Sequence, residues 1–392
     1  MRQKGDGMER EIKKKAPLLD GRGRLRRAGY AKRMQFIYNR DRVRSFPLRL
    51  KEWDFYQIQK GNMVLQMTIG HVSYMCSVSA TLMDLDTGEK YESGIMRPLF
   101  VPQMETDPEG MSHLQYRQKD FSMSFLVKRD RRILRMRGGT GAKVLSEQGA
   151  AKGVSAEKER VEIDLTLTND PANEKMVIAT PFAHPTQFYL NYKENYYMVA
   201  GKVCFGDREE DFTGATGLLD WGRGVWPYSH QWFWGSATAR LDESGRPVAS
   251  MDGKDRPGER TAGLPEEDGV PFGLNIGWGF GDLSHATENM FFYRRKAYKI
   301  RGLKVERPKK PEPKRKMEGA ELADTWMLQD AAGKLSLEFT PFFDNYTARP
   351  FVVVETHCHQ LFGTFRGFVM TEEGRIPIDG VNGFIEHAVN RW

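Results

Sequence analysis

The sequence has few cysteines and lacks any long apolar segment. Its 392 residues include three cysteines, Cys76, Cys204 and Cys358, which are too few for a disulfide framework and are not spaced as zinc ligands. No apolar run approaches the ~18 residues that a membrane-spanning helix needs, and the charged first residues lack the apolar core of a secretory signal. These absences predict a reduced, cytoplasmic protein without a transmembrane segment.

Positive charge is concentrated near the N-terminus. Residues 1–51 contain 17 lysines and arginines but 5 acidic residues, so they carry +12, whereas the whole chain carries +7. The sequence therefore predicts a basic N-terminal arm over residues 1–46. A charge run of this kind usually forms a solvated surface, and a peripheral contact with an anionic membrane surface is the alternative. No specific nucleic-acid partner is predicted.

Alternation of apolar and polar residues predicts β-strands in most of the chain. In residues 161–168 every odd position is apolar, which is typical of a strand with one buried face. The same period recurs at residues 63–69, 121–127 and 335–339, with turn signals such as Asp-Thr-Gly at residues 86–88 between the runs. No long segment has helical periodicity, so we expect an all-β fold.

Antiparallel strands joined by hairpins must protect their edges, and closure into a barrel does so. About 345 residues follow the arm, which suits two eight-stranded barrels, each large enough for one small ligand. We therefore predict two tandem lipocalin-like antiparallel β-barrels, over residues 47–185 and 186–392. Three polar segments, residues 146–160, 242–269 and 306–318, are expected to be loops.

The most distinctive segment is residues 213–237, TGATGLLDWGRGVWPYSHQWFWGSA. It holds four tryptophans, five glycines and a single carboxylate, that of Asp220. Trp232 and Trp234 are two positions apart, so on a strand they project to the same side, and the nearby glycines leave room for a ligand. A second glycine-aromatic run, NIGWGFGDLS at residues 275–284, follows it.

Asp220 lies between apolar neighbours, and this environment suggests one kind of chemistry. If the side chain is buried, desolvation disfavours its charged form and raises its pKa. A neutral carboxylic acid can then protonate a substrate alkene or carbonyl, and tryptophan faces can stabilise the resulting cation. The alternative interpretation is structural: Asp220 caps backbone N–H groups at a corner while the tryptophans fill the core.

Four stretches resemble the bacterial family called domain of unknown function 2804. They are RLKEWDFY at 49–56, GLLDWGRGVWPY at 217–228, NIGWGFGDLSHATENM at 275–290 and FGTFRG at 362–367. The resemblance covers nearly the whole chain but implies no particular activity. More distantly, the glycine-rich segment with Trp-x-Trp-Gly is similar to the carotenoid hydratase and tocopherol cyclase group, whose members have paired lipocalin-like barrels.

In those hydratases the acid lies in a motif of the form Tyr-x-Asp-His-Asn, so the resemblance implies that Asp220 is the acid. The surrounding positions depart from the motif, because Leu218, Trp221 and Gly222 replace the tyrosine, histidine and asparagine. Arg223 adds a cation nearby. It can favour an ionised Asp220, or it can bind a carboxylate or phosphate of the ligand.

We therefore expect Asp220 to be catalytic and nine further side chains to contact a lipophilic ligand. The nine are Trp221, Arg223, Trp226, Tyr228, Trp232, Trp234, Trp278, Asp282 and His184. The predicted function is binding of an unsaturated apolar molecule, with its acid-catalysed hydration, cyclisation or isomerisation. A non-catalytic carrier or sensor of a hydrophobic small molecule is the alternative.

A metal site is a weaker candidate. Glu355, His357 and His359 are two positions apart, so on a strand they share a face, and two histidines with a carboxylate can hold a metal. A strand whose polar side faces solvent gives the same pattern. No fourth ligand is evident, and the sequence predicts neither a metal nor another cofactor.

Overall fold

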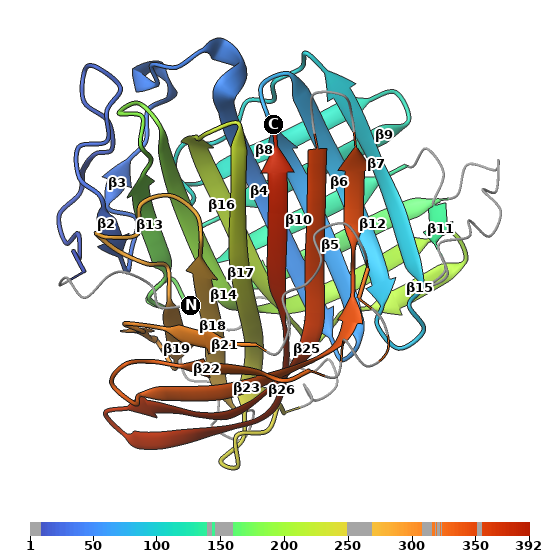
Figure 1. Cartoon of the computed structure of the whole chain (residues 1–392). Coiled ribbons are helices and arrows are strands. Elements are labelled where there is room, and N and C mark those ends of the chain that lie inside the picture. Colours follow the sequence, from blue (N-terminus) through green and yellow to red (C-terminus); the bar gives the residue numbers. More distant parts are fainter. Residues whose placement is uncertain are drawn as a thin grey trace.

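A computed structural model describes residues 9–138, 143–145, 160–248, 269–307, 324–350 and 355–392, with isolated positions between 316 and 322. Strands dominate these residues (Figure 1). The described helices are two 3-10 turns, η1 (Arg40–Arg42) and η2 (Pro47–Arg49). No helix among the described residues is long and apolar enough to cross a membrane.

The first sheet contains fourteen strands. They are β2 (Gly29–Ala31), β4 (Leu50–Lys60), β5 (Met63–His71), β6 (Met75–Asp84), β7 (Lys90–Pro98), β8 (Ser112–Gln118), β9 (Phe121–Val127), β10 (Arg131–Arg137), β11 (Lys143–Leu145), β12 (Val161–Thr168), β13 (Met176–Pro181), β14 (Phe188–Phe205), β15 (Arg208–Asp211) and β16 (Ala215–Val225). The main path runs β11-β7-β6-β5-β4-β16-β14-β12-β10-β9-β8, and β13 and β15 also pair with β14.

The second sheet contains ten strands. They are β17 (Ser229–Leu241), β18 (Val270–Trp278), β19 (Met290–Tyr293), β20 (Lys296–Lys299), β21 (Lys304–Glu306), β22 (Trp326–Gln329), β23 (Leu335–Asp344), β24 (Thr347–Pro350), β25 (Glu355–Thr371) and β26 (Gly374–Arg391). Its path runs β20-β19-β18-β17-β26-β25-β23-β22-β21, and β24 pairs with β25. A small parallel pair, β1 (Ala16–Pro17) with β3 (Phe36–Ile37), completes the described strands.

Each large sheet is antiparallel and curls into a half-barrel, so the predicted all-β fold with two tandem lipocalin-like units is confirmed. The expected alternation on β12 is also present: Val161, Ile163, Leu165 and Leu167 are buried in the first core, and the residues between them are partly exposed. Burial of every second side chain is what the two-residue period of a strand produces.

The chain passes from the first sheet to the second between Val225 and Ser229, later than the division at residues 185/186 drawn from the sequence. Residues 182–187 connect two neighbouring strands of the first sheet. The strands before and after them, β13 and β14, pair with each other, starting at Pro181 and Phe188. Strands β14 and β16 then extend the same sheet, and β16 pairs with β4.

The basic N-terminal segment is not a free tail over residues 9–46, in contrast to the expectation of a solvated arm. Strand β2 pairs with β13, and apolar side chains spaced along the segment, among them Leu18, Met34 and Phe36, are buried in the first core. Apolar burial therefore ties the segment down while most of its cations remain at the surface.

The two sheets pack face to face over part of their area. In Figure 1 the red strands β25 and β26 run alongside the blue strands of the first sheet and then curve away with β22 and β23. A shared apolar cluster includes Val64 and Leu218 from the first sheet and Trp234, Phe362 and Phe384 from the second. Most of each of the three expected loops lies outside the described residues.

Candidate functional site

A cavity of about 390 Å³ lies between the two sheets. One wall comes from β4, β5, β14 and β16, and the other from β17, β24, β25 and β26, with the segment that follows β18 covering one side. The volume falls in the range of small-molecule sites, which are mostly apolar with a few placed polar groups. This cavity has that composition.

Two cross-strand pairs face each other across the cavity. Lys193 of β14 lies opposite Asp220 of β16 in the first sheet, and Trp234 of β17 lies opposite Glu386 of β26 in the second. The Lys193 ammonium is 4.0 Å from the centre of the Trp234 ring. The pleat thus directs one ammonium, two carboxyl groups and an indole into the same space.

Asp220 is buried and well supplied with hydrogen-bond donors. Its Oδ2 accepts from Trp53 Nε1 at 2.9 Å, and its Oδ1 accepts from Asn191 Nδ2 at 2.6 Å. Lys193 Nζ lies 3.7 Å from Oδ1. Two N–H donors and a cation stabilise the ionised form of a carboxyl group. Asp220 therefore has polar partners around its carboxyl group, whereas its sequence neighbours suggested an apolar environment.

A glycine makes the Trp53 contact possible. Trp53 lies opposite Gly222 in the pairing of β4 with β16, and a Cβ atom at Gly222 would lie 2.1 Å from the Trp53 ring. The absence of a side chain lets the indole lie flat across the strand and reach Asp220, two positions away on the same face.

Glu386 has a different environment from Asp220. Its Oε1 accepts one hydrogen bond, from Trp232 Nε1 at 2.7 Å. Burial raises the pKa of Glu386 to about 7, and the nearby Asp220 carboxylate contributes in the same direction. A carboxyl group with a pKa near 7 is about half protonated at neutral pH and can release its proton to a bound molecule.

Glu288 completes the charged cluster. Its Oε2 lies 2.9 Å from Lys193 Nζ and accepts from Asn275 Nδ2 at 3.2 Å. A Cβ atom at Gly277 would lie 2.1 Å from the Glu288 carboxylate, so this position of the Gly-Trp-Gly run leaves space for the acidic side chain. Lys193 therefore lies between two carboxylates, Asp220 and Glu288.

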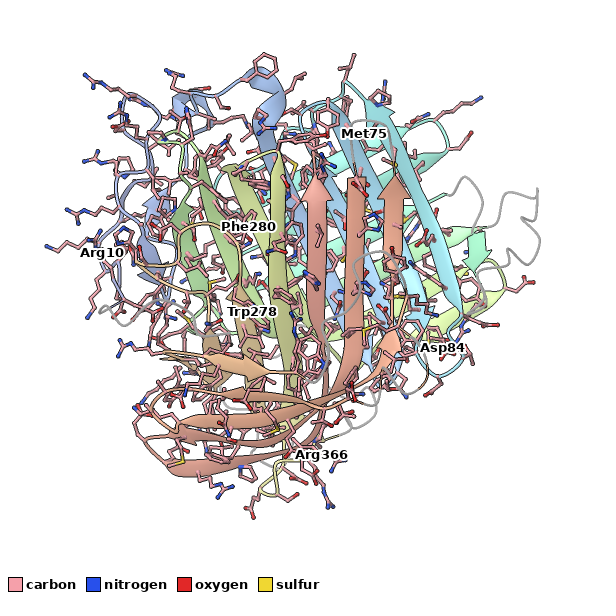
Figure 2. All side chains as sticks on the ribbon, in the orientation of Figure 1. Arg10, Met75, Asp84, Trp278, Phe280 and Arg366 are labelled. Atoms are coloured by element: carbon pink, nitrogen blue, oxygen red, sulfur yellow. The ribbon has the colours of Figure 1, made fainter. Side chains whose placement is uncertain are left out.

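Aromatic side chains close one end of the cavity. Trp226 makes edge contacts with Trp53, Tyr189, Phe280 and Trp392 at centroid distances of 5.4–6.0 Å. Phe280 lies over the middle of the strands in Figure 2, whereas Trp278 lies farther toward the curled end. These rings give the cavity an apolar, π-rich wall.

A buried lysine lies behind this wall. Lys51 Nζ is 4.9 Å from the ring centres of both Trp226 and Trp392. Burial lowers the pKa of Lys51 to about 7. Its ammonium does not line the cavity but lies against two indoles that do.

Amide side chains gather in another part of the cavity. Gln66 Nε2 donates to Gln360 Oε1 at 2.8 Å, and Asn345 Nδ2 donates to the same oxygen at 3.2 Å. Thr68, Thr347 and Cys358 also line the cavity. This polar region can hold water or a polar substituent of a ligand.

The family model called domain of unknown function (DUF2804) matches residues 9–392. The chain belongs to this family. The family predicted from the four sequence stretches is thus confirmed. No curated protein matches the chain.

Two solved structures are similar to the chain over most of their length. A protein provisionally assigned as AttH from Nitrosomonas europaea has 12% identity and a TM-score of 0.45, covering 89% of this chain and 95% of that one. Kievitone hydratase from Nectria haematococca has 9% identity and a TM-score of 0.42, covering 90% of this chain and 93% of that one.

Four of the ten predicted site residues of this DUF2804 protein line the cavity: Asp220, Trp226, Trp232 and Trp234. The other six lie elsewhere: Trp221, Arg223, Tyr228, Trp278, Asp282 and His184. The segment singled out from the sequence therefore supplies cavity residues, but the sequence did not separate its two faces.

Trp221 and Arg223 lie on the opposite face of β16 from Asp220. Arg223 Nη2 donates to Asp54 Oδ1 at 2.8 Å, and its guanidinium lies 3.9 Å over the Trp221 ring. Trp221 in turn makes an edge contact with Tyr38 in the first core. Both residues are an odd number of positions from Asp220, which places their side chains away from the cavity, so neither lines it.

The remaining four predicted residues have local roles. Trp278 stacks on Phe233 with ring centres 4.8 Å apart. Asp282 accepts from the backbone N–H of Ser284, and His184 lies beside Thr186 at the surface. Tyr228 is 42% exposed.

The candidate metal ligands are paired with other side chains. His357 Nε2 lies 3.0 Å from Glu355 Oε1, while His359 Nδ1 lies 2.8 Å from Asp344 Oδ2. Tyr346 OH is 2.8 Å from His357 Nδ1. Within the described part of the chain, no three acidic, histidine or cysteine side chains are grouped as a metal site.

Four important cavity residues were missed by the sequence analysis: Trp53, Lys193, Glu288 and Glu386. Trp53 and Glu288 lie in stretches that carried the family resemblance, and that was a usable signal. Lys193 and Glu386 lie in strands without a distinctive local pattern, and only the pairing of β14 with β16 and of β26 with β17 brings them to the site.

Proposed function

We propose that the cavity binds a lipophilic, unsaturated small molecule and catalyses proton transfer on it, with Glu386 as the acid and Asp220 as the base. The observation that carries the proposal is the pair of carboxyl groups in unlike environments. Glu386 accepts from Trp232 Nε1 and from the Cys358 thiol and has a pKa raised to about 7 by burial, whereas Asp220 accepts from two side-chain N–H donors beside an ammonium. Carboxyl groups held in opposite protonation states are a recurring arrangement for acid–base catalysis.

Hydration of an alkene is the reaction that uses every part of this arrangement. Glu386 donates its proton to one alkene carbon, and the π-electron pair forms the new C–H bond. The adjacent carbon becomes cationic and is stabilised by indole faces such as that of Trp234. A water oxygen then bonds to that carbon, and its surplus proton passes to Asp220. Solvent returns the proton to Glu386, so the net change is addition of one water molecule.

Lys193 and Glu288 act as positioning residues in this scheme. The ammonium lies 3.7 Å from Asp220 Oδ1 and orients that carboxyl group, and the 2.9 Å pair with Glu288 holds the ammonium in place. The amide groups of Gln66 and Gln360, which also line the cavity, are suited to hold the attacking water. Isomerisation uses the same acid and base, with Asp220 removing a proton from carbon instead of from water.

The test begins with the ligand. Native mass spectrometry and solvent extraction of the purified chain should reveal an apolar molecule, which is then incubated with fresh protein in D₂O and followed by mass. Wild type should incorporate deuterium on carbon. Glu386→Gln and Asp220→Asn should reduce incorporation by ~10² to 10⁴ while changing the ligand dissociation constant less than about threefold.

Asp282→Asn is the matched control, because this carboxylate lies outside the cavity and should leave incorporation unchanged. If wild type binds the molecule but exchanges no hydrogen on carbon, the catalytic proposal is overturned and the protein is a carrier. If no apolar molecule binds at all, the ligand class is wrong as well.

A further inference from the structure

Apolar side chains are exposed at one end of the molecule, outside the cavity. Four of them form what we call the docking face: Phe46 at 68% exposure, Leu48 at 43%, Leu99 at 81% and Tyr228 at 42%. Scattered exposed apolar residues are ordinary on proteins, but a contiguous group marks a surface for another apolar partner. Contacts among the segments that carry these side chains bring them to the same end of the molecule.

Backbone and side-chain contacts place the docking face on one end of the strands. Leu99 N–H donates to the carbonyl of Tyr74, and Arg49 N–H donates to the carbonyl of Phe46. Burial raises the pKa of Tyr74. The nearby Tyr228 raises it as well, and the nearby Arg49 lowers it, so both side chains lie close to Tyr74. Tyr74 thus lies between the segments that carry Leu99, Phe46 and Tyr228.

Figure 2 locates this end. Met75, which follows Tyr74 directly, lies at the top of the view, and Arg366 lies at the opposite end of the molecule. The described chain end on β26 is also at the top in Figure 1. The docking face therefore occupies the end where β4 begins and where β16 and β26 finish.

The exposure of Leu99 is held by an unfavourable backbone conformation. Its φ is 53°, in the left-handed region that residues with a bulky side chain rarely adopt. The hydrogen bond to Tyr74 fixes this conformation and leaves the leucine side chain 81% exposed. Such a conformation costs free energy and persists only where the surrounding contacts hold it.

Exposed cations lie close in sequence to the apolar side chains. Arg42 and Arg44 are exposed beside Phe46, and Arg97 is exposed beside Leu99. Among the residues that the structure describes, none of these three guanidinium groups forms an ion pair, and the Arg44 and Arg97 groups bond instead to a carbonyl and to a tyrosine hydroxyl. Exposed apolar side chains with exposed arginines within four positions of them in the chain have the composition that binds the interface of an anionic lipid bilayer.

The docking face adjoins the aromatic end of the cavity. The Tyr228 carbonyl accepts from the backbone N–H of Trp392 at 2.9 Å, and Arg49 donates to the Trp226 carbonyl at 3.2 Å. Both tryptophans line the cavity. A bilayer in contact with this face would therefore lie next to the apolar wall of the site.

We propose that the docking face binds the surface of an anionic lipid bilayer, with Phe46 and Leu99 entering the interface and Arg42 and Arg44 pairing with headgroup phosphates. This surface would place the cavity beside the membrane from which a lipophilic molecule is taken. The proposal concerns the outer surface and holds whether or not the cavity is catalytic.

Co-sedimentation of the full chain with vesicles tests it. Vesicles of phosphatidylcholine alone are compared with vesicles in which about one lipid in three is phosphatidylglycerol. Both kinds are measured at low and at high salt. Wild type should bind the anionic vesicles and lose binding at high salt. Arg42→Gln with Arg44→Gln should lower the partition coefficient by about 25-fold, since each cation near such a surface contributes about fivefold.

Phe46→Ser with Leu99→Ser should lower it by roughly tenfold, because less apolar surface enters the interface. Phe342→Ser and Arg366→Gln are the matched controls. Phe342 is an exposed aromatic side chain of β23, and Arg366 lies at the far end of the molecule (Figure 2). Both variants should bind as wild type does. Failure of wild type to bind anionic vesicles overturns the proposal. A result in which the arginine variant loses binding but Phe46→Ser with Leu99→Ser binds as wild type does also overturns it, since the face would then recognise polyanions in general.

Discussion

The unlike carboxyl groups make a measurable prediction about stability, which centres on Glu386. Burial raises the pKa of Glu386 from 4.5 to about 7 in the folded protein. Between these two values the folded state binds more protons than the unfolded state, so stability falls as pH rises through this range. A pKa difference of this size lowers the free energy of unfolding by about 3 kcal/mol at pH 8 relative to low pH. Screening by water in the cavity makes the loss smaller.

Glu386→Gln removes the titration but keeps a side chain of the same shape, whose Oε1 still accepts from Trp232. At pH 5 the folded wild type holds the proton, so the variant and wild type should have similar free energies of unfolding. At pH 8 the variant should be more stable by on the order of 2–3 kcal/mol. Urea unfolding at both pH values, followed by tryptophan fluorescence, measures the difference.

Glu338→Gln serves as the control, since Glu338 is an exposed glutamate on the second sheet; its effect should not change between pH 5 and pH 8. A Glu386→Gln variant that is equally stable relative to wild type at both pH values would refute the reasoning. So would a variant that is less stable at pH 8, because Glu386 would then be better accommodated as an anion than as a neutral acid.

Two further substitutions test the geometry that supports the site. Gly222→Ala places a Cβ atom 2.1 Å from the Trp53 ring; it should cost about 1–3 kcal/mol in urea unfolding and shift the tryptophan emission. Gly217→Ala on the same strand, whose nearest contact would be 3.4 Å, should do neither. Arg223→Met should cost about 3–5 kcal/mol in urea unfolding, because it leaves the buried Asp54 carboxylate unpaired, while the exposed Arg135→Met should cost under about 1 kcal/mol. Equal effects of Arg223→Met and Arg135→Met would show that the buried ion pair does not stabilise the fold.

The fold class could be predicted because strand periodicity is a local property. The alternation over residues 161–168 is visible without any knowledge of neighbouring strands. The point where the chain changes sheets could not be found in this way. Residues 182–187 have the composition of a linker, but β13 and β14 pair across them, and that pairing depends on contacts that no local pattern records.

The N-terminal segment illustrates the same limit. Its charge dominates the composition, so the sequence favoured a solvated arm. Its apolar residues, such as Leu18 and Phe36, are widely spaced, and their burial depends on packing against side chains of the first sheet. Net charge describes the surface that such a segment presents and says little about where its few apolar side chains lie.

The site divides in a similar way between local and distant information. Asp220, Trp232 and Trp234 were found because they lie within fifteen residues of one another in a conspicuous segment. The contacts that decide the protonation of Asp220 come from other strands, through Trp53 and Lys193. A prediction made from the immediate neighbours alone therefore gave Asp220 an apolar environment, and the proton-donor role that followed from it.

The pairing of the two sheets explains why one carboxyl group is suited to give a proton and the other to accept one. Asp220 lies on the sheet that also carries its donors, Trp53 and Asn191, and the ammonium of Lys193. Glu386 enters from the opposite sheet, where Trp232 is a hydrogen-bond donor to it, and it faces a carboxylate that is already present. The second charge is therefore the costly one. Trp232→Phe removes the hydrogen bond that stabilises the Glu386 anion, so it should raise the pKa of Glu386 above 7, and urea unfolding of the variant across pH measures that rise.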